Sequence, residues 1–195
     1  MLRIGLTGGI ATGKSTVSNY LKELAYPLVD ADLIARQLVG PGQEGLERLV
    51  ARFGRKILDK SGALNRQAFG QRLFGDAQLR QEVDQLLHPL IYEALEAESQ
   101  RLAQAGAQLA FFDIPLLYET GYDQKMDQVW VVYLPHDLQV ERLMARNGWN
   151  QGQAEAAIAS QASIETKRQG ADLVIDNQGS LAATFAQVDQ ALSRL

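Results

Sequence analysis

A glycine-rich segment close to the amino terminus reads Gly8-Gly9-Ile10-Ala11-Thr12-Gly13-Lys14-Ser15. It matches the pattern G-x-x-x-x-G-K-[ST], in which glycines let several backbone N–H groups face one phosphate at the positive end of the next helix. An apolar strand pattern over 2–6 enters the loop, and a helical pattern over 15–24 leaves it. The stretch therefore predicts a nucleotide-phosphate site, with Lys14 reaching the β- and γ-phosphates and Ser15 holding Mg²⁺. The competing interpretation is a glycine turn with an exposed lysine.

Short apolar runs alternate with helical patterns along the rest of the chain. Further strands are expected at 27–29, 109–114, 129–134 and 173–175. The run 129–134 shows no polar alternation, as expected for a strand buried on both faces of a parallel sheet. Two longer helical stretches, 31–104 and 136–168, interrupt the alternation. The pattern predicts an α/β fold with a parallel sheet, in which residues 31–104 form a helical insertion over one end.

The bulk composition argues against several classes of function. Lys and Arg number 19 and Asp and Glu 23, a formal net charge of −4, so no basic field points to nucleic acid or an anionic membrane. The absence of cysteine excludes disulfides, thiolate metal sites and cysteine nucleophiles, and fits a reducing compartment. The apolar runs are too short for a membrane span or a signal peptide. These features predict a soluble, cytoplasmic protein.

Two aspartates, Asp30 and Asp32, follow the strand expected at 27–29. Ligands of doubly wound sheets bind beyond the carboxyl ends of the strands, so these carboxylates are expected to face the crevice near the glycine-rich loop. One of them can accept the proton of an attacking hydroxyl, while the other orders Mg²⁺ or the acceptor. The alternative is that one aspartate only N-caps a helix that begins near Leu33. The spacing leaves both interpretations open.

Polar residues at three further places are candidates for the same site. Asp113 ends a predicted strand and could hold Mg²⁺ through water, as acidic residues do in related nucleotide sites. Arg142 and Arg146 share one face of a predicted helix and could clamp phosphates, or they could pair with acidic neighbours on a solvated surface. His88 precedes a proline and could simply close a helix, where the helix dipole favours it.

A phosphate-binding loop indicates a nucleotide but not a reaction. GTPases need a guanine-reading N-K-x-D pattern after the core strands, and the sequence has none. Two classes remain. One is a kinase that acts on a small molecule such as a nucleotide or a shikimate-like acceptor, and the other is a module that binds ATP without transferring phosphate.

Six ordered segments together resemble the dephospho-CoA kinase family over nearly the whole chain. The matching residues are Gly8-Gly9-Ile10 with Gly13-Lys14-Ser15-Thr16, Val29-Asp30-Ala31-Asp32 with Arg36, Leu87-His88-Pro89-Leu90-Ile91, Asp113-Ile114-Pro115-Leu116-Leu117-Tyr118-Glu119, Glu141-Arg142-Leu143-Met144-Ala145-Arg146, and Ala159-Ser160-Gln161 before Lys167 with Ala171-Asp172-Leu173-Val174-Ile175-Asp176-Asn177-Gln178-Gly179. Six such segments in order are far more specific than the loop alone.

The resemblance implies transfer of the ATP γ-phosphoryl group to the ribose 3′-hydroxyl of dephospho-CoA, which gives CoA and ADP in the last step of CoA synthesis. It implies that Asp32 is the general base and that the other catalytic residues are Lys14, Arg142 and Arg146. The implied ATP contacts are Ala11, Thr12, Gly13, Lys14, Ser15, Thr16, Asn177 and Gly179. The implied acceptor contacts are Asp30, Arg36, His88, Asp113, Leu116 and Glu119. Ser15 would hold Mg²⁺, with Asp113 as a second candidate ligand.

The same resemblance implies an architecture, a P-loop NTPase fold with a five-stranded parallel core. The nucleotide-binding core would comprise 1–30, 105–135 and 169–195. Residues 31–104 would form a helical domain on the CoA side, and 136–168 a lid over the phosphates. ATP and dephospho-CoA are the expected partners, and a monomer is favoured.

Two positions depart from the family pattern. Ala11-Thr12 stands where the family usually has Gly-Ser. Both residues fit a backbone with negative φ, so little consequence is expected. Ala157 stands where the lid commonly has an arginine, so a lid contact by that arginine is in doubt. The weight of phosphate binding then shifts to the remaining cations of the region, Arg142, Arg146 and Lys167.

Overall fold

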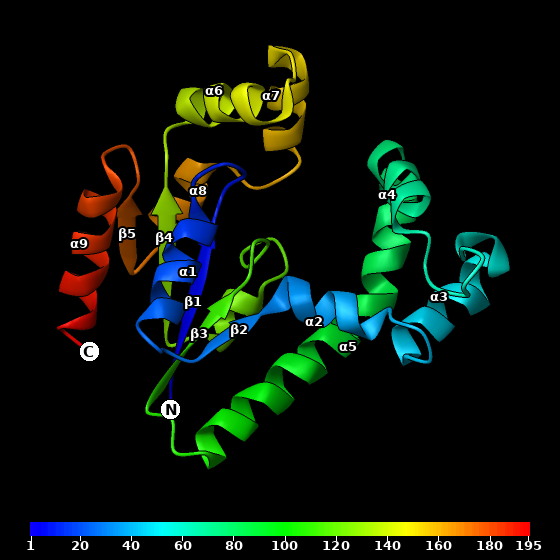
Figure 1. The fold of residues 1–195 in the computed structure, drawn as a ribbon, viewed down its shortest axis with the longest axis horizontal. Coiled ribbons are helices and arrows are strands. Elements are labelled where there is room, and N and C mark those ends of the chain that lie inside the picture. The colour runs from blue at the N-terminus through cyan, green and yellow to red at the C-terminus, as the bar shows by residue number, and fades with distance from the viewer. The chain divides into compact units, whose positions relative to one another are not determined.

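The computed structural model describes residues 1–195, apart from the side chain of Phe74. A five-stranded sheet lies at its centre (Figure 1), in the order β2 (Leu28–Asp30), β3 (Leu109–Asp113), β1 (Leu2–Gly8), β4 (Gln128–Tyr133) and β5 (Leu173–Asp176). β1 pairs in parallel with β3 and β4, and β4 pairs in parallel with β5. The strands lie where the sequence predicts them, so the parallel α/β fold is confirmed.

Two helices, α1 (Lys14–Glu23) and α9 (Leu181–Leu192), share a core with one face of the sheet (Figure 1). Ile4 and Leu6 of β1 point to this core because residues two apart along a strand lie on the same face. Val17 and Leu21 of α1, one helical turn apart, meet them and are fully buried. The helix that follows the glycine-rich loop is therefore fixed against the strand that precedes it.

The last helices before β5 lie beyond the carboxyl ends of β1 and β4, on the side of the glycine-rich loop (Figure 1). They are α6 (His136–Asn147), α7 (Gln151–Ala159) and α8 (Ile164–Gln169), and a short 3₁₀ helix, η2 (Tyr122–Lys125), precedes β4. Val140 and Leu143 of α6 pack with Ala154 and Ile158 of α7. Ile10 of the loop packs against this cluster, which joins the two helices to the loop.

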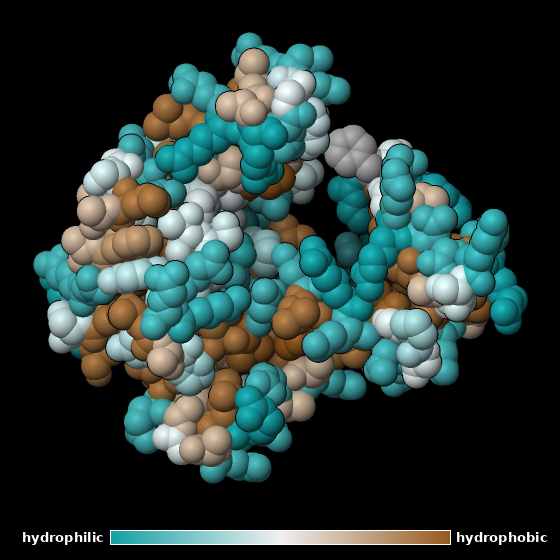
Figure 2. Space-filling view, in the orientation of Figure 1, coloured by the Kyte–Doolittle hydropathy of each residue, from teal (hydrophilic) through white to brown (hydrophobic). Residues whose placement is uncertain are grey.

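The chain divides into two compact units, which we call unit 1 (Met1–Val29 and Leu102–Leu195) and unit 2 (Asp30–Arg101). Unit 2 is helical, as the sequence predicts for this insertion. Its elements are α2 (Ala31–Leu38), α3 (Glu44–Phe53), η1 (Arg55–Ile57), α4 (Arg66–Gly75) and α5 (Ala77–Gln104), the last of which runs on into unit 1. A separate core of Val39, Leu49, Ile57, Phe69 and Val83 holds it together. Hydrophilic side chains cover most of its visible face (Figure 2).

One predicted boundary is wrong. His88 and Pro89 do not end a helix, because both lie inside the 28-residue α5. A proline in a helix interior removes a hydrogen bond and disfavours the preceding turn. Here α5 continues because apolar residues on both sides of the proline, Val83, Leu90 and Leu95, are buried. Among the described residues, the structure contains no helix long and apolar enough to cross a membrane.

Candidate functional site

The glycine-rich loop runs from the end of β1 at Gly8 to the start of α1 at Lys14 (Figure 1). Gly13 is the N-cap of α1 and has a left-handed backbone, with φ of +93°. A Cβ at this position would lie 2.1 Å from Nδ2 of Asn177. A Cβ at Gly8 would lie 2.6 Å from Oγ1 of Thr12. Both positions therefore need glycine for steric reasons, and the loop leads directly into the positive end of a helix.

Ala11 contradicts an expectation from the sequence. Its φ is +63°, not negative, so this alanine occupies the left-handed region. An L-residue with a Cβ is disfavoured there by about 1–2 kcal/mol. Glycine, which the resemblance leads one to expect at this position, avoids that cost. The substitution thus places local strain inside the phosphate-binding loop, a consequence that sequence alone could not show.

The loop backbone accepts hydrogen bonds from a side chain of the loop itself and from a distant part of unit 1. Thr12, which is fully buried, donates from Oγ1 to the carbonyl of Gly9 at 2.9 Å. Asn177 donates from Nδ2 to the carbonyl of Thr12 at 2.7 Å, and its own Oδ1 accepts from Oγ1 of Thr184 at 2.8 Å. The resemblance implies that Asn177 contacts ATP, whereas in the structure its amide donates a hydrogen bond to the loop. Gly179 lies between β5 and α9, and its expected ATP contact stays a prediction.

Two glutamines connect the loop to the helical region 136–168. Gln161 accepts from the backbone N–H of Ile10 through Oε1 at 3.2 Å. Gln139 is 1 % exposed and donates from Nε2 to the carbonyl of Leu134 at 2.8 Å. Among the described residues its Oε1 has no hydrogen-bond partner, and a Cβ on Gly9 would lie 2.7 Å from it. Gln139 is not among the site residues predicted from the sequence, although a polar residue one turn before the buried Leu143 was an available signal.

Lys14, the first residue of α1, meets Asp113, the last residue of β3. The register pairs Leu6 of β1 with Asp113 of β3, which brings the carboxylate beside the loop. Nζ of Lys14 donates to Oδ1 of Asp113, and Oγ of Ser18 donates to Oδ2 at 2.5 Å. Asp113 is 5 % exposed, whereas Ser15 at the start of α1 is exposed. The structure thus brings together the predicted phosphate-binding lysine and a predicted magnesium ligand.

The two arginines of α6 have different surroundings. Arg142 donates from Nη2 to the carbonyl of Asn177 at 2.9 Å. Its Nη1 lies 3.7 Å from the point that a Cβ on Gly13 would occupy. Arg146, one turn further on, donates from Nε to Oδ1 of Asn147 at 3.0 Å, and both arginines are exposed. Arg142 therefore lies at the phosphate-binding loop in this structure, whereas Arg146 makes a local hydrogen bond.

Lys167 differs from the expectation that it acts as a lid cation. It is fully buried, and its ammonium donates to the carbonyls of Gly8 at 3.2 Å and Pro115 at 2.9 Å. Oε1 of Glu119 lies 2.9 Å from the same nitrogen. Burial lowers the pKa of Lys167, and the Glu119 carboxylate opposes this shift. Glu119, predicted to contact the acceptor, is therefore paired with a buried lysine, while Leu116 from the same segment is exposed.

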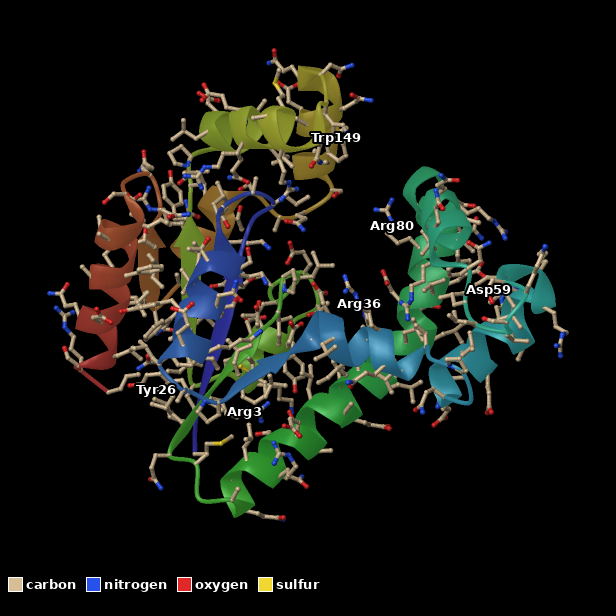
Figure 3. All side chains as sticks on the ribbon, viewed as in Figure 1. Arg3, Tyr26, Arg36, Asp59, Arg80 and Trp149 are labelled. Atoms are coloured by element: carbon tan, nitrogen blue, oxygen red, sulfur yellow. The ribbon has the colours of Figure 1, made fainter. Side chains whose placement is uncertain are left out.

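The remaining predicted residues belong to unit 2. Asp30 is the N-cap of α2, since its Oδ1 accepts from the backbone N–H of Leu33 at 3.0 Å. The capping alternative thus applies to Asp30, and Asp32 lies in the first turn of the helix. Asp32 and Arg36 are exposed and four residues apart, so they share a face of α2, on which Figure 3 labels Arg36. His88 of α5 stacks on Tyr92, with ring centroids 5.8 Å apart.

Comparison with known protein families gives a match along almost the entire chain. A family model described as dephospho-CoA kinase matches residues 2–183. The chain belongs to the dephospho-CoA kinase family. Dephospho-CoA kinase from Shouchella clausii is 40 % identical over 99 % of this chain and 98 % of its own length. The Listeria monocytogenes enzyme of that name is 44 % identical over 98 % of this chain and 96 % of its own.

Solved structures agree with this family assignment. Dephospho-CoA kinase from Campylobacter jejuni superposes with a TM-score of 0.74 at 28 % identity, covering 98 % of this chain and 95 % of that one. TT1252 from Thermus thermophilus gives a TM-score of 0.80 at 32 % identity, covering 100 % and 97 %. Shikimate kinase from Aquifex aeolicus, at 15 % identity and a TM-score of 0.52 over 98 % and 96 %, shares the fold alone. The P-loop kinase fold and the family resemblance read from the sequence are both confirmed.

Proposed function

We propose that the protein transfers the γ-phosphoryl group of ATP to the 3′-hydroxyl of the dephospho-CoA ribose, giving CoA and ADP. The observation that carries this proposal is the family match over residues 2–183, which takes in both the phosphate-binding loop and the helical unit 2. The loop geometry supports the donor half of the reaction. Its left-handed Gly13 places the start of α1 where backbone N–H groups and the helix dipole favour phosphate.

On the donor side, Lys14 binds the β- and γ-phosphates and follows the transferring group. Arg142 is the better placed of the two α6 arginines to stabilise charge on that group, because it already lies against Gly13 and Asn177. Arg146 would join it in the clamp. The loop residues 11–16 and Gly179 are the proposed ATP contacts. Asn177 acts on ATP indirectly in this proposal, through its hydrogen bond to Thr12.

The residues near the loop fit a magnesium ion. Ser15 offers a hydroxyl and Asp113 a carboxylate, and Mg²⁺ prefers such oxygen ligands. Among the described residues no group of three or more His, Cys, Asp or Glu could hold a metal by itself. That agrees with an ion that keeps several waters and binds through substrate phosphates. When bound, it would neutralise charge on the β- and γ-phosphate oxygens.

On the acceptor side, Asp32 is the proposed general base. The N-cap of α2 is supplied by Asp30, so Asp32 is not needed for capping. Such a group can orient a ribose hydroxyl and take its proton as the new bond to phosphorus forms. Arg36 on the same helix face is proposed to bind an acceptor phosphate. The other proposed acceptor contacts are Asp30, His88, Asp113, Leu116 and Glu119.

We assign the parts of the chain as follows. Unit 2 is the acceptor domain, and the strands and remaining helices form the nucleotide core. The lid consists of α6 and α7, which is less than 136–168, since Lys167 of α8 is buried against the carbonyl of Gly8. A monomer is the proposed active species. Light scattering on the eluted protein tests that point.

The proposed activity is tested by incubating the protein with ATP, Mg²⁺ and a panel of acceptors. The panel contains dephospho-CoA, a nucleoside monophosphate and shikimate, and ADP release is followed by a coupled assay, with the Lys14→Ala variant as the background. We expect ADP release with dephospho-CoA only. Faster transfer to another acceptor would assign a different small-molecule kinase. Tight ATP binding without transfer to any acceptor would assign a nucleotide-binding module.

A further inference from the structure

Lys167 is the largest charged side chain that is fully buried in the described structure. Burial of a cation is costly unless hydrogen bonds and an opposite charge compensate for it. Its ammonium has three N–H donors, and three acceptors surround it, the carbonyls of Gly8 and Pro115 and Oε1 of Glu119. All three donors are therefore used inside the protein. Lys167 has no donor left for a phosphate, so any effect on the reaction must pass through these acceptors.

The three acceptors lie at places that border the donor site. Gly8 is the last residue of β1 and the first of the phosphate-binding loop. Pro115 follows Asp113 by two residues, and its carbonyl also accepts from Oγ1 of Thr7 at 3.1 Å. Glu119 accepts a second hydrogen bond, from the backbone N–H of Ala162 at 2.9 Å. One ammonium thus joins the loop, the segment after β3 and the segment after α7.

We propose that Lys167 is a positioning residue for the donor nucleotide, which holds the carbonyl of Gly8 against the segment after β3 and so fixes the start of the loop. The inference rests on the proposed function only in taking an adenine nucleotide as the ligand of the loop. Lys14 lies near the same segment, because its Nζ donates to Asp113, two residues before Pro115. Lys167 keeps the loop in place, and Lys14 is left to bind phosphate.

The competing explanation is that Lys167 only neutralises the buried side of Glu119. Three variants separate the two roles, namely Lys167→Met, Glu119→Gln and the double variant. Lys167→Met keeps the length of the side chain but leaves the Glu119 carboxylate without its cation. The double variant removes that uncompensated charge and should recover thermal stability. ADP affinity, measured by calorimetry with Mg²⁺ present, and the melting temperature are recorded for each variant.

We expect Lys167→Met to weaken ADP binding by roughly 10- to 100-fold, the range for lost hydrogen bonds to a charged group. The double variant should regain melting temperature but not ADP affinity, because the bonds to Gly8 and Pro115 are still missing. Recovery of both together would overturn the proposal and leave charge compensation as the role of Lys167. Unchanged ADP affinity in Lys167→Met would also overturn it.

Glu119→Gln keeps the test decisive if the lysine variants do not fold. Lys167 retains both carbonyl bonds in this variant, so ADP affinity should stay within about 2-fold of the wild type, and a 10-fold loss would contradict the proposal. Val188→Ala, at a fully buried residue of α9, is the matched control for a general loss of stability. It should lower the melting temperature without changing ADP affinity. ADP binding needs no acceptor, so these results stand whether or not dephospho-CoA proves to be the substrate.

Discussion

The phosphate-binding loop of unit 1 and the Asp30–Arg36 segment of unit 2 carry the two halves of the proposed reaction, but they are held in different ways. The loop is fixed by side chains far away in sequence, among them Asn177, Gln161 and Lys167. The aspartate segment is held by a local device, the cap that Asp30 places on α2. The donor side therefore depends on the tertiary fold, whereas the acceptor side depends on a few neighbouring residues.

The largest effect is expected on the acceptor side, when the carboxylate of Asp32 is replaced by an amide. Asp32→Asn should lower kcat by on the order of 10²–10⁴, the usual contribution of a positioned acid or base. ADP affinity and melting temperature should hardly change, because the cap belongs to Asp30. The measurements are kcat at saturating substrates, calorimetry with ADP and a thermal melt. Near-normal turnover would remove Asp32 from the catalytic residues, and a large loss of stability would show that its role is structural.

The next effect concerns the α6 arginines on the donor side. Arg142→Ala should lower kcat/KM through a loss of transition-state stabilisation of about 1.5–3 kcal/mol, the range for hydrogen bonds to charged groups. Arg146→Ala should reduce it less, because Arg142 donates to the carbonyl of Asn177 beside Gly13, whereas Arg146 donates to its sequence neighbour Asn147. Steady-state kinetics of both variants, with circular dichroism to confirm folding, check this order. Wild-type kinetics for both variants would assign them to the solvated surface.

A smaller effect is expected at Ala11, whose left-handed backbone strains the loop. Ala11→Gly should stabilise the protein by about 1 kcal/mol, since glycine adopts this conformation without the Cβ clash. Ala25, after α1, also has a positive φ, +61°, and provides the matched control Ala25→Gly. Both variants should raise the free energy of unfolding, but only Ala11→Gly should alter ADP affinity. Equal ADP affinities in the two variants would mean that strain in the loop does not reach the ligand.

The smallest effect is a pH dependence at Tyr118. Burial, helped by the charges of Asp123 and Asp172, raises the pKa of its hydroxyl to about 12. The folded state therefore keeps this proton between about pH 10 and 12 while the unfolded chain loses it, so stability falls as pH rises through that window. Tyr118→Phe should remove this part of the decline, as chemical denaturation on either side of pH 10 can show. An identical decline in the variant would contradict the assignment.

The same variant also tests the hydrogen bonding of Tyr118 at neutral pH. Its buried hydroxyl has no partner among the described residues. An unsatisfied buried polar group is destabilising, so removing it should leave the melting temperature at pH 7 unchanged or higher. A clear loss of stability at pH 7 would show that the hydroxyl is satisfied in solution.

The sequence predicted the features that depend on neighbouring residues. The loop pattern identified Lys14 and Ser15, and uninterrupted apolar runs located the strands, because buried parallel strands have no polar face. Features that depend on distant contacts were missed or wrong. The φ of Ala11 depends on how the loop is held. Lys167 was expected to bind phosphate because the acceptors that bury it are far away in sequence. The helix through Pro89 likewise depends on burial of both halves of α5.

Phosphoryl transfer from ATP to the ribose 3′-hydroxyl of dephospho-CoA can be followed directly in one experiment on the wild-type protein. Phosphorus NMR of a reaction containing ATP, Mg²⁺ and dephospho-CoA should show a new monoester resonance that coincides with that of authentic CoA and grows in step with ADP. Lys14→Ala should abolish this growth. A phosphorylated product with a resonance different from the 3′-phosphate of CoA, or ATP bound with no new monoester, would contradict phosphoryl transfer to the 3′-hydroxyl.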